Sequence, residues 1–578
     1  MSIQPFSPYH YVDLDPEAWQ NRLDQLLREA VAEHGQRAAD DSAQDNWLKE
    51  IILKLYSFPE KQLQAAKPPK VPKTICVIGG GIAGLTAAYE LSSKGYKVQL
   101  LEASPRLGGR MCTHQFDKST YGELGAMRIP RNHECVRHYI QQFKLDTREF
   151  VSLNSDAYLY LRGRRERIED FMNLQALFNL RPPRPPGHSC VGRSPLNSAE
   201  QFIRFHMSLL TASDFRSIFQ EFDIPPELRL LEQFSLGQLM RGDHRSGFGY
   251  FGADACEYLG RGTGMLWFDQ ASCLQFILNE LALKEPNKDE IIGGMVKLVD
   301  AFAGALNKLG VAVALNCPVT TIEVQGKSKV QVFWRTKQGD EKRDFDYVVC
   351  ATPAGATLRL RFEPPLAARV YEALTNISYA SSGKTIVLSD QRFWEKDGIF
   401  GGGSYTDLAN QQIWYPSDNS APDPLSAVGV GYIASNDQST KRIAKQKALA
   451  DKPGVFTAAY MWGANARRFA ALDAAQRTEL ILPCVEKVHP NCRTFIKNAN
   501  VVHHSWDEQE NPGHGAFAFF GPGEQSRYQR YLCEPHPLRS NEPRVFFAGE
   551  HLAICHAWIQ NAIQSALGTV LNILALPT

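Results

Sequence analysis

A glycine-rich turn lies between a short apolar run and a helical pattern in the first fifth of the chain. Residues 75–78 (ICVI) are typical of a buried strand, residues 79–84 (GGGIAG) follow, and an Ala/Leu-rich segment comes next. Gly79 permits a tight turn, Gly81 lets the backbone approach phosphate oxygens, and Gly84 lets helix and strand pack closely. Because a helix N-terminus presents bare N–H groups to an anion, the chemistry expected here is the binding of a pyrophosphate.

An acidic residue completes this pattern. Residues 98–101 (VQLL) are typical of a second strand, and Glu102 follows it, 23 residues after Gly79. At this distance a carboxylate can accept hydrogen bonds from a ribose diol. The strand, turn, helix, strand and acid together predict a Rossmann-like βαβ unit that binds a dinucleotide. A glycine-rich turn without a ligand is the alternative, and the ordered set of features disfavours it.

Composition narrows the class of protein. A chain of 578 residues is expected to hold two or three domains, and 44% hydrophobic with 22% charged residues is ordinary for a globular protein. A net charge of +1 gives no electrostatic reason to expect nucleic acid or a membrane surface as a partner. The twelve cysteines are scattered and never form C-x-x-C. We therefore expect a reduced, metal-free, cytoplasmic protein without a signal peptide or transmembrane segment.

Further strands and helices follow from the hydrophobic periodicity. A helical pattern covers residues 12–57, and residues 136–290 are predicted to be mostly helical, interrupted by a proline-rich linker at 180–187. The nucleotide-binding strands are expected to come from three separated segments, near residues 75–102, 311–351 and 545–548. Strands of a second sheet are predicted at residues 384–390, 427–434 and 456–462, and a final helix from about residue 557.

These elements predict an α/β fold (α+β overall) with discontinuous domains. The predicted division is an N-terminal helical arm (1–72), a nucleotide-binding domain (73–110, 291–360 and 530–578), a substrate domain (111–170 and 361–529) and a helical domain (171–290).

Several motifs in a fixed order identify the type of dinucleotide protein. Residues 106–110 (RLGGR) resemble the extended fingerprint of flavoproteins of the amine oxidase superfamily, in which FAD occupies the site. The other motifs are residues 122–130 (GELGAMRIP), Lys384, residues 393–394 (FW), residues 548–551 (AGEH) and residues 556–559 (HAWI). From residue 73 to 578 the chain resembles the FAD-dependent L-amino-acid oxidases of the flavin monoamine oxidase superfamily. The resemblance implies an FAD-binding domain of the glutathione-reductase/amine-oxidase type, a mixed-sheet substrate domain and a helical domain.

In this resemblance, Arg128 is the residue that indicates which class of substrate the protein binds. The matching arginine of the family pairs with the α-carboxylate of the substrate, and a planar guanidinium suits this task because it makes two parallel charge-assisted hydrogen bonds. A surface arginine is the alternative. Simple amine oxidases have no carboxylate to hold, so Arg128 favours amino acids over amines.

Other residues of the expected catalytic site follow from the same resemblance. Tyr432 and Trp558 match the aromatic positions that flank the substrate, with Ala557 beside them, and the tyrosine hydroxyl can also donate to the carboxylate. Both aromatic residues could instead belong to the core. Lys384 matches a lysine that holds a water near flavin N5 and assists reoxidation by oxygen, since a positive charge stabilises developing negative charge.

The resemblance also implies how FAD is held. Val319 matches a valine whose backbone reads the adenine, Gly549 and Glu550 are expected at the diphosphate and ribityl chain, and the last helix N-terminus is expected near the flavin N1–C2=O edge. Residues 513–523 lack the cysteine that attaches FAD in some relatives, so we expect non-covalent binding. The expected cofactor-binding residues are Gly79, Gly81, Ile82, Ala83, Gly84, Glu102, Ala103, Arg110, Gly125, Ala126, Met127, Arg128, Val319, Trp506, Gly549, Glu550, Ala557, Trp558 and Ile559.

The preferred side chain of the substrate is less well determined. Three acids, Asp507, Glu508 and Glu510, follow Trp506, and Glu508 could pair with a cationic side chain such as that of arginine or lysine. A solvated acidic loop explains these residues equally well. Gln270, at the end of residues 267–270 (WFDQ), is a candidate for the distal wall. The preference is therefore expected to be basic or broad.

The function expected from these parts is oxidative deamination of L-amino acids. The Cα hydrogen would pass as a hydride to FAD N5, and the products would be a 2-oxo acid, ammonia and hydrogen peroxide. An L-amino-acid monooxygenase, an amine or polyamine oxidase, and a non-catalytic FAD-binding protein remain alternatives. The expected partners are the amino acid and oxygen, and the helical arm invites a homodimer or larger homo-oligomer.

Overall fold

The structure is a computed structural model that describes residues 57–178, 218, 224, 228–241, 254, 257–258, 260–261, 270–282, 287–326, 329–418, 450–508, 513, 515–537 and 543–576. Several predictions fall outside these ranges. They are the helical pattern of residues 12–56, the proline-rich linker, the strand at residues 427–434, and Tyr432.

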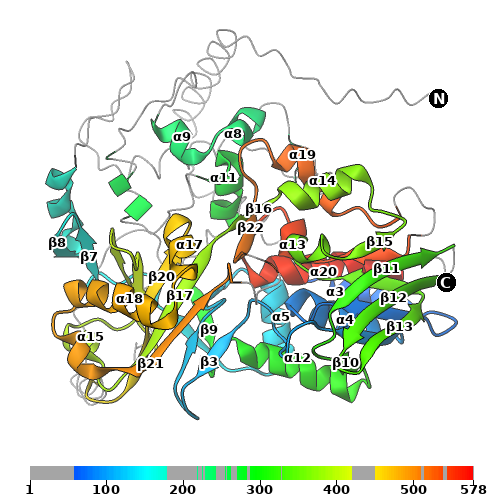
Figure 1. The fold of residues 1–578 in the computed structure, drawn as a ribbon, viewed down its shortest axis with the longest axis horizontal. Helices are drawn as coiled ribbons and strands as arrows, with labels where there is room; N and C mark the ends of the chain where they lie inside the picture. The colour runs from blue at the N-terminus through cyan, green and yellow to red at the C-terminus, as the bar shows by residue number, and fades with distance from the viewer. Residues whose placement is uncertain are drawn as a thin grey trace, which may run out of the picture.

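A five-stranded parallel sheet forms the nucleotide-binding part of the molecule, to the right in Figure 1. Its order is β10 (Ala312–Ala314), β2 (Lys97–Leu101), β1 (Thr74–Ile78), β14 (Tyr347–Cys350) and β23 (Val545–Phe547). All four pairings are parallel. The prediction that three distant segments supply one sheet is therefore confirmed, and such a sheet is buried on both faces, as its apolar strands require.

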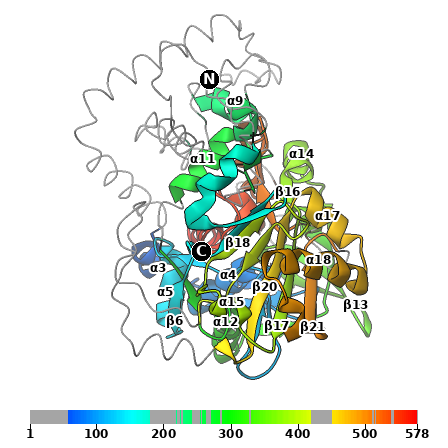
Figure 2. The same cartoon turned by 90° about the vertical axis from the view of Figure 1, so that its left-hand side faces the viewer.

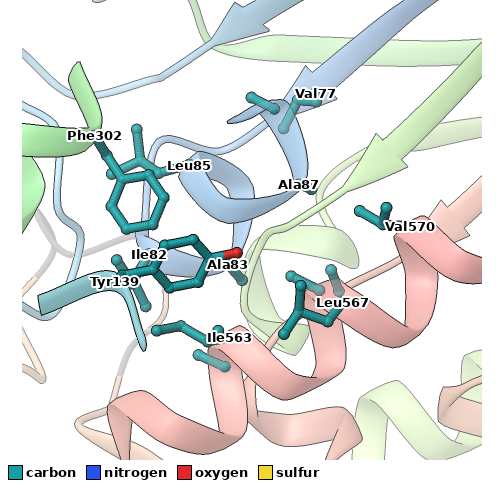
Figure 3. Close-up of a cluster of buried hydrophobic side chains, with 14 of the residues drawn as sticks. Val77, Ile82, Ala83, Leu85, Ala87, Tyr139, Phe302, Ile563, Leu567 and Val570 are labelled. Carbon is teal, nitrogen blue, oxygen red and sulfur yellow. The ribbon is translucent and has the colours of Figure 1, made fainter. Parts of the chain in front are cut away.

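Helices from three distant parts of the sequence pack with α4 (Ile82–Ser93), the first helix of this unit. They are α5 (Glu134–Gln142), α12 (Val296–Lys308) and α20 (Ile559–Leu574). Figure 3 shows Ile563 and Leu567 on the face of α20 that meets Ile82 and Ala83 of α4. Because each buried Leu or Ile contributes about 1.5–3 kcal/mol, this interface fixes the helix whose N-terminus faces the nucleotide.

The segment between β10 and β14, together with a strand that follows β14, forms a separate sheet, which the sequence did not predict. Its order is β13 (Gly339–Phe345), β12 (Lys329–Thr336), β11 (Val319–Gln325) and β15 (Arg361–Glu363). Of the strands expected from residues 311–351, β11 and β12 therefore lie outside the nucleotide-binding sheet and pair antiparallel with each other. Short connections explain this outcome, since a parallel pairing needs a long crossover whereas a hairpin needs only a turn.

A seven-stranded mixed sheet lies on the opposite side of the molecule, to the left in Figure 1. Its order is β21 (Ile496–Ser505), β17 (Ser382–Ser389), β20 (Gly454–Trp462), β19 (Gln412–Trp414), β18 (Gly403–Thr406), β7 (Tyr158–Leu161) and β8 (Arg164–Arg167). The strands predicted near residues 384–390 and 456–462 are confirmed as β17 and β20.

The prediction of a mostly helical segment from residue 136 was wrong in its first part. After α5 the chain forms β6 (Thr147–Phe150), β7 and β8, and β9 (Lys288–Ile291) pairs with both β5 (Ile129–Pro130) and β6. Strands β7 and β8 form a hairpin whose turn residues, Arg162 and Gly163, have φ of 49° and 82°. A two-residue turn with positive φ at both positions matches strand twist, so local turn chemistry decided this segment.

Shorter elements complete the fold. Helices α9 (Leu236–Arg241) and α11 (Cys273–Ala282) lie at one end and α12 lies at the other in both views (Figures 1 and 2). Among the described residues, no helix is both long enough and apolar enough to cross a membrane. The remaining elements are α3 (Glu60–Ala65), β3 (Thr113–Gln115), β4 (Tyr121–Glu123), η1 (Ile168–Leu177), α8 (Arg229–Gln233), α13 (Ala354–Thr357), α14 (Ala368–Asn376), β16 (Ser378–Ala380), α15 (Phe393–Lys396), α17 (Ala464–Ala470), α18 (Ala474–Val488), η5 (Cys492–Phe495), β22 (Phe517–Phe519), α19 (Gln525–Leu532) and η6 (Glu550–Leu552).

Candidate functional site

The glycine turn after β1 has the geometry that phosphate binding requires. Gly79 has φ of 104°, and its N–H donates to the Leu101 carbonyl at 2.8 Å. A Cβ built on Gly84 would lie 1.9 Å from the Gly79 carbonyl oxygen, whereas a Cβ on Gly81 would meet no atom within 4 Å. Gly84 is thus required for packing, and the side of Gly81 is open. Helix α4 begins there without a side-chain cap or an acid in its first turn, so its free N–H groups suit an anion.

Glu102 is held at the end of β2 by the backbone. Its carboxylate accepts hydrogen bonds from the N–H groups of Gly80 at 2.5 Å and Ser104 at 2.8 Å. The adjacent Ala103 is exposed, and Cys317, two residues before Val319, donates its N–H to the Glu102 carbonyl at 2.9 Å. This arrangement fixes the carboxylate beside the open glycine turn and brings Val319 to the same end of the sheet, as a ribose and an adenine would require.

Glu550 connects three segments of the expected flavin site. One carboxylate oxygen accepts from Arg110 Nη1 at 2.6 Å and from the Ala518 N–H at 2.9 Å, and the other accepts from the Ala557 N–H at 3.1 Å. Burial raises the pKa of this carboxyl, but the charges of Arg110 and His556 and the hydrogen bonds from Ala518 and Arg110 together outweigh burial and hold the pKa below its usual value. Glu550 is therefore an ionised link. Gly549, with φ of 154°, precedes it.

The segment after β4 joins this network to Lys384. A Cβ on Gly125 would lie 1.9 Å from the Arg110 carbonyl oxygen, so the two segments are in close contact. Lys384 Nζ donates to the Gly125 carbonyl at 2.6 Å and lies 3.3 Å from the Glu123 carbonyl oxygen. Trp506 donates its indole N–H to the Leu124 carbonyl at 3.3 Å. Lys384 and Trp506 thus both donate hydrogen bonds to backbone carbonyls of residues 123–125.

Lys384 is buried, with 3% of its surface exposed. Burial lowers the pKa of its ammonium group, although the charge of Glu123 opposes this shift. Burial in turn raises the pKa of the Glu123 carboxyl, whose oxygen accepts from the Met295 N–H at 2.7 Å. The nitrogen of Lys384 also lies 4.7 Å from the Tyr460 ring centre. A buried lysine in a network of this kind is typical of a functional site.

Arg128 presents a guanidinium without an acidic partner. Its Cζ lies 5.2 Å from the ring centre of Trp414 and 5.8 Å from that of Trp558. Within the part of the chain that the structure describes, the guanidinium makes no hydrogen bond and no ion pair. The side chain is half-buried. Its donors are therefore free to bind a carboxylate from outside the chain, which is unusual for an arginine placed between aromatic rings in a protein interior.

Trp414 was missed by sequence reasoning, which selected Tyr432 as the second aromatic residue. Trp414 ends the three-residue strand β19 and is 5% exposed. Its indole N–H donates to Gln412 Oε1 at 2.8 Å. The aromatic cluster at residues 413–415 (IWY) was a visible signal, but a strand of this length shows no periodicity that assigns a face.

Two predicted substrate residues have other neighbours. The Glu508 carboxylate accepts from Arg477 Nη1 at 2.6 Å, and Arg477 also donates to the Phe469 carbonyl. Gln270 is exposed, and its Nε2 would lie 3.4 Å from a Cβ on Gly463, just after β20. Neither residue has a described contact with Arg128.

The other predicted cofactor residues lie on the segments already described. Trp558 precedes α20 as an N-cap without a side-chain hydrogen bond, and no acid stands in the first turn of that helix. Ile559 is buried, as are Ile82, Ala83 and Met127, whereas Ala126 is half-buried.

A closed circuit of contacts therefore connects the predicted residues. Arg110 packs against Gly125, whose carbonyl accepts a hydrogen bond from Lys384. Arg128, on the same segment as Gly125, lies beside the Trp558 ring. The N–H of the adjacent Ala557 donates to Glu550, which pairs with Arg110. An open phosphate-binding turn, a buried lysine and an unpaired guanidinium thus lie on adjoining segments. Such a site can hold a dinucleotide next to a small carboxylate.

Known proteins resemble this chain over most of its length. The chain is 29% identical over 520 residues to an L-amino-acid oxidase of Vipera ammodytes ammodytes, covering 88% of this chain and 94% of that protein. It is 29% identical over 504 residues to an L-amino-acid oxidase of Crotalus adamanteus, covering 86% of each.

Solved structures show the same fold. A putrescine oxidase bound to putrescine has a TM-score of 0.62 at 20% identity, covering 88% of this chain and all of that one, 100%. The cyclohexylamine oxidase of Brevibacterium oxydans has a TM-score of 0.62 at 17% identity, covering 87% of this chain and 99% of that one.

The family itself is decided by the sequence. The profile of the family described as flavin containing amine oxidoreductase matches residues 82–574, which is most of the chain and includes α4 from its first residue, Arg128, Lys384 and the start of α20. The open turn, the fixed Glu102 and the two uncapped helix N-termini fit FAD. The chain therefore belongs to the flavin-containing amine oxidoreductase family, and it is an FAD-dependent oxidoreductase.

Proposed function

We propose that this protein catalyses the oxidative deamination of L-amino acids. The observation that carries the proposal is the guanidinium of Arg128, which is half-buried between two tryptophans and has no acidic partner among the described residues. A substrate α-carboxylate would supply the missing partner through two charge-assisted hydrogen bonds. An amine without a carboxylate would leave this cation unpaired.

The residues of the site would divide the work as follows. Arg128 would bind and orient the carboxylate, and the Trp558 ring would limit the positions open to the rest of the substrate. Bound FAD would supply the two-electron oxidation of the Cα–N bond. Lys384 would hold a water with the hydrogen that it otherwise gives to Met127 Sδ, a weak acceptor at 3.4 Å, since its other two donors go to carbonyl oxygens. The imino acid would hydrolyse to a 2-oxo acid and ammonia, with hydrogen peroxide formed from oxygen.

The relatives support an amino acid over an amine as substrate. The L-amino-acid oxidases match at 29% identity over most of both chains. The solved structures of a putrescine oxidase and a cyclohexylamine oxidase are at most 20% identical, so they inform the fold and not the substrate. Arg128 is the feature of this chain that an amine substrate does not explain.

We further propose a broad side-chain preference. The alternative was a preference for cationic substrates through Glu508, but Arg477 occupies that carboxylate at 2.6 Å. A cationic substrate would have to displace this ion pair. Glu508 therefore has less reason to select lysine or arginine than its sequence position indicated.

Three finer proposals concern the state of the protein. Non-covalent FAD is supported by the absence of cysteine from residues 513–523. A cytoplasmic location is proposed from the cysteines that lie buried in apolar strands as small hydrophobic side chains, such as Cys76 and Cys350. A homo-oligomer is proposed from the predicted N-terminal helical arm, and light scattering of the full chain would test it.

A peroxide-coupled screen of L-amino acids, D-amino acids and amines tests the function. Turnover of L-amino acids with equimolar 2-oxo acid and peroxide is expected. An amide product would instead indicate a monooxygenase, and faster turnover of amines than of amino acids would contradict the role of Arg128. Bound flavin that stays oxidised under anaerobic challenge with all these compounds would indicate a non-catalytic protein.

A further inference from the structure

We propose that Trp414 and Trp558 together form a clamp that presents the Arg128 guanidinium to the substrate carboxylate, with Trp414 acting as a positioning residue. The inference rests on the proposed function, and it assigns Trp414 a role that the sequence did not indicate. The clamp comes from three segments: Arg128 lies before β5, Trp414 ends β19, and Trp558 precedes α20.

The clamp holds a cation without occupying its donors. Both indole rings lie within the range of a cation–π contact, at 5.2 Å and 5.8 Å from Cζ of Arg128. The attraction acts through the face of each ring, whereas the guanidinium N–H groups lie in the guanidinium plane and stay available. An Asp or Glu partner would hold the arginine equally well but would compete with the incoming carboxylate. Two tryptophans can therefore hold the guanidinium while its N–H groups stay available to the substrate, whereas an ion pair would occupy them.

Trp414 is itself fixed in position. Its indole N–H donates to Gln412 Oε1 at 2.8 Å, and its ring packs 5.7 Å from the Phe150 ring and 6.2 Å from the Tyr405 ring. A long arginine loses side-chain entropy when it is ordered on binding. Because the fixed Trp414 ring restricts the Arg128 side chain before the substrate binds, less side-chain entropy is lost on binding.

Tyr415, the residue that follows β19, adds to this rigidity. The Tyr415 hydroxyl lies 2.6 Å from His489 Nε2 and 2.7 Å from Ser404 Oγ, and His489 Nδ1 lies 3.0 Å from an Asp397 oxygen. This buried chain of hydrogen bonds joins β19 to β18, α15 and the end of α18. A shift of Trp414 away from Arg128 would have to disrupt it.

Carboxylate binding therefore depends on Trp414 even though the indole donates its only N–H elsewhere. Replacing the ring by an aliphatic side chain frees the guanidinium to adopt other rotamers, so carboxylates bind about three- to tenfold more weakly. Amines have no carboxylate, so their turnover does not depend on Trp414. Trp414→Phe keeps a ring face and loses only the hydrogen bond to Gln412, so it retains most of the binding.

The test measures binding of benzoate and of the neutral analogue benzamide to the FAD-loaded enzyme by calorimetry, with KM and kcat for one L-amino acid. The variants are Trp414→Leu and Trp414→Phe. The control is Trp394→Phe, because Trp394 is a fully buried indole of the neighbouring core whose N–H has no partner among the described residues. Gln412→Met provides a second, milder variant if Trp414→Leu does not fold.

We expect Trp414→Leu to weaken benzoate binding and raise KM three- to tenfold with kcat little changed, and Trp414→Phe to stay within about threefold of the wild type. Gln412→Met should raise KM less than Trp414→Leu, and Trp394→Phe should lower the melting temperature only. Wild-type benzoate affinity in Trp414→Leu or, where that variant does not fold, in both Gln412→Met and Trp414→Phe, would overturn the clamp, as would equal weakening by Trp394→Phe. A wild type that oxidises amines in preference to amino acids would instead overturn the proposed function.

Discussion

The guanidinium of Arg128 lies 5.2 Å from the ring centre of Trp414, although β19 is far from Arg128 in the sequence. Arg128 precedes the short strand β5, whereas Trp414 belongs to the seven-stranded sheet. The proposed carboxylate-binding residue Arg128 therefore lies between the three-stranded sheet that contains β5 and the seven-stranded sheet, beside the segment that binds Lys384.

Gly84→Ala is expected to abolish FAD binding. The added Cβ would lie 1.9 Å from the Gly79 carbonyl oxygen, and backbone cannot move aside cheaply, so the turn must open. The control is Gly568→Ala in α20, where a Cβ meets no atom within 4 Å and the substitution should be neutral or stabilise by up to about 1 kcal/mol. Flavin absorbance per protein and melting temperature check both variants. Full FAD content in Gly84→Ala would contradict the assigned role of this turn.

Glu550→Gln is expected to loosen the flavin site. The amide cannot carry the charge that pairs with Arg110 at 2.6 Å, and removing one partner of a buried ion pair costs about 3–5 kcal/mol. Glu550 also accepts the Ala557 N–H at 3.1 Å, so the backbone before α20 should become less ordered. Dialysis against FAD-free buffer should then release flavin faster than from the wild type. Unchanged retention and stability would show that the link is dispensable.

Lys384→Met is expected to slow the reaction with oxygen more than the reaction with substrate. The buried ammonium is the group placed to stabilise negative charge, and loss of one such group typically costs about a hundredfold or more in rate. Stopped-flow mixing of substrate-reduced enzyme with oxygen measures this step directly, and anaerobic mixing with the amino acid measures the other. Lys329→Met, which removes a half-exposed lysine from another sheet, is the matched control. Equal slowing of both steps would indicate general damage instead.

His504 should make the folded protein sensitive to acid. Burial, reinforced by the charges of Arg106, Arg477 and Lys384, lowers the pKa of this imidazole to about 4. Since an unfolded histidine titrates near about 6.5, the unfolded state binds more protons below that pH, and stability falls as the pH falls from about 6.5 towards about 4.

The contribution of His504 is isolated by His504→Gln. At a pH of about 5, His504 lowers the free energy of unfolding by up to about 2 kcal/mol, and His504→Gln should not show this decrease. Melting temperatures at pH 7 and 5 should therefore fall more for the wild type than for His504→Gln. Parallel changes in the two proteins would show that His504 does not bear the assigned pKa shift.

The sequence predicted those parts of the fold and site that rest on local patterns. The turn at residues 79–84 and the acid at Glu102 follow from spacing alone, and the parallel sheet was recovered because its strands are nearly continuous apolar runs. Family motifs indicated Arg128 and Lys384, whose roles stay predictions that the contacts support.

The parts that sequence did not predict depend on tertiary pairing. The three residues of β19 carry no periodicity, so the contact of Trp414 with Arg128 could not be inferred. The partner of Glu508 is Arg477 on α18, 31 residues earlier, and no local sequence pattern predicts this ion pair. The hairpin of β7 and β8 was missed because its basic, Gly-containing turn was included in a helical segment.

One measurement tests the central claim most directly: the anaerobic reduction of the bound FAD by L-phenylalanine and by its decarboxylated analogue 2-phenylethylamine, in the wild type and in Arg128→Met. The account predicts that the wild type is reduced much faster by the amino acid. In Arg128→Met the apparent affinity for the amino acid should fall roughly tenfold or more, as expected for a lost charged hydrogen bond of about 1.5–3 kcal/mol. Reduction by the amine should be little changed in that variant. Faster reduction of the wild type by the amine, or an amino acid affinity that Arg128→Met leaves unchanged, would contradict it.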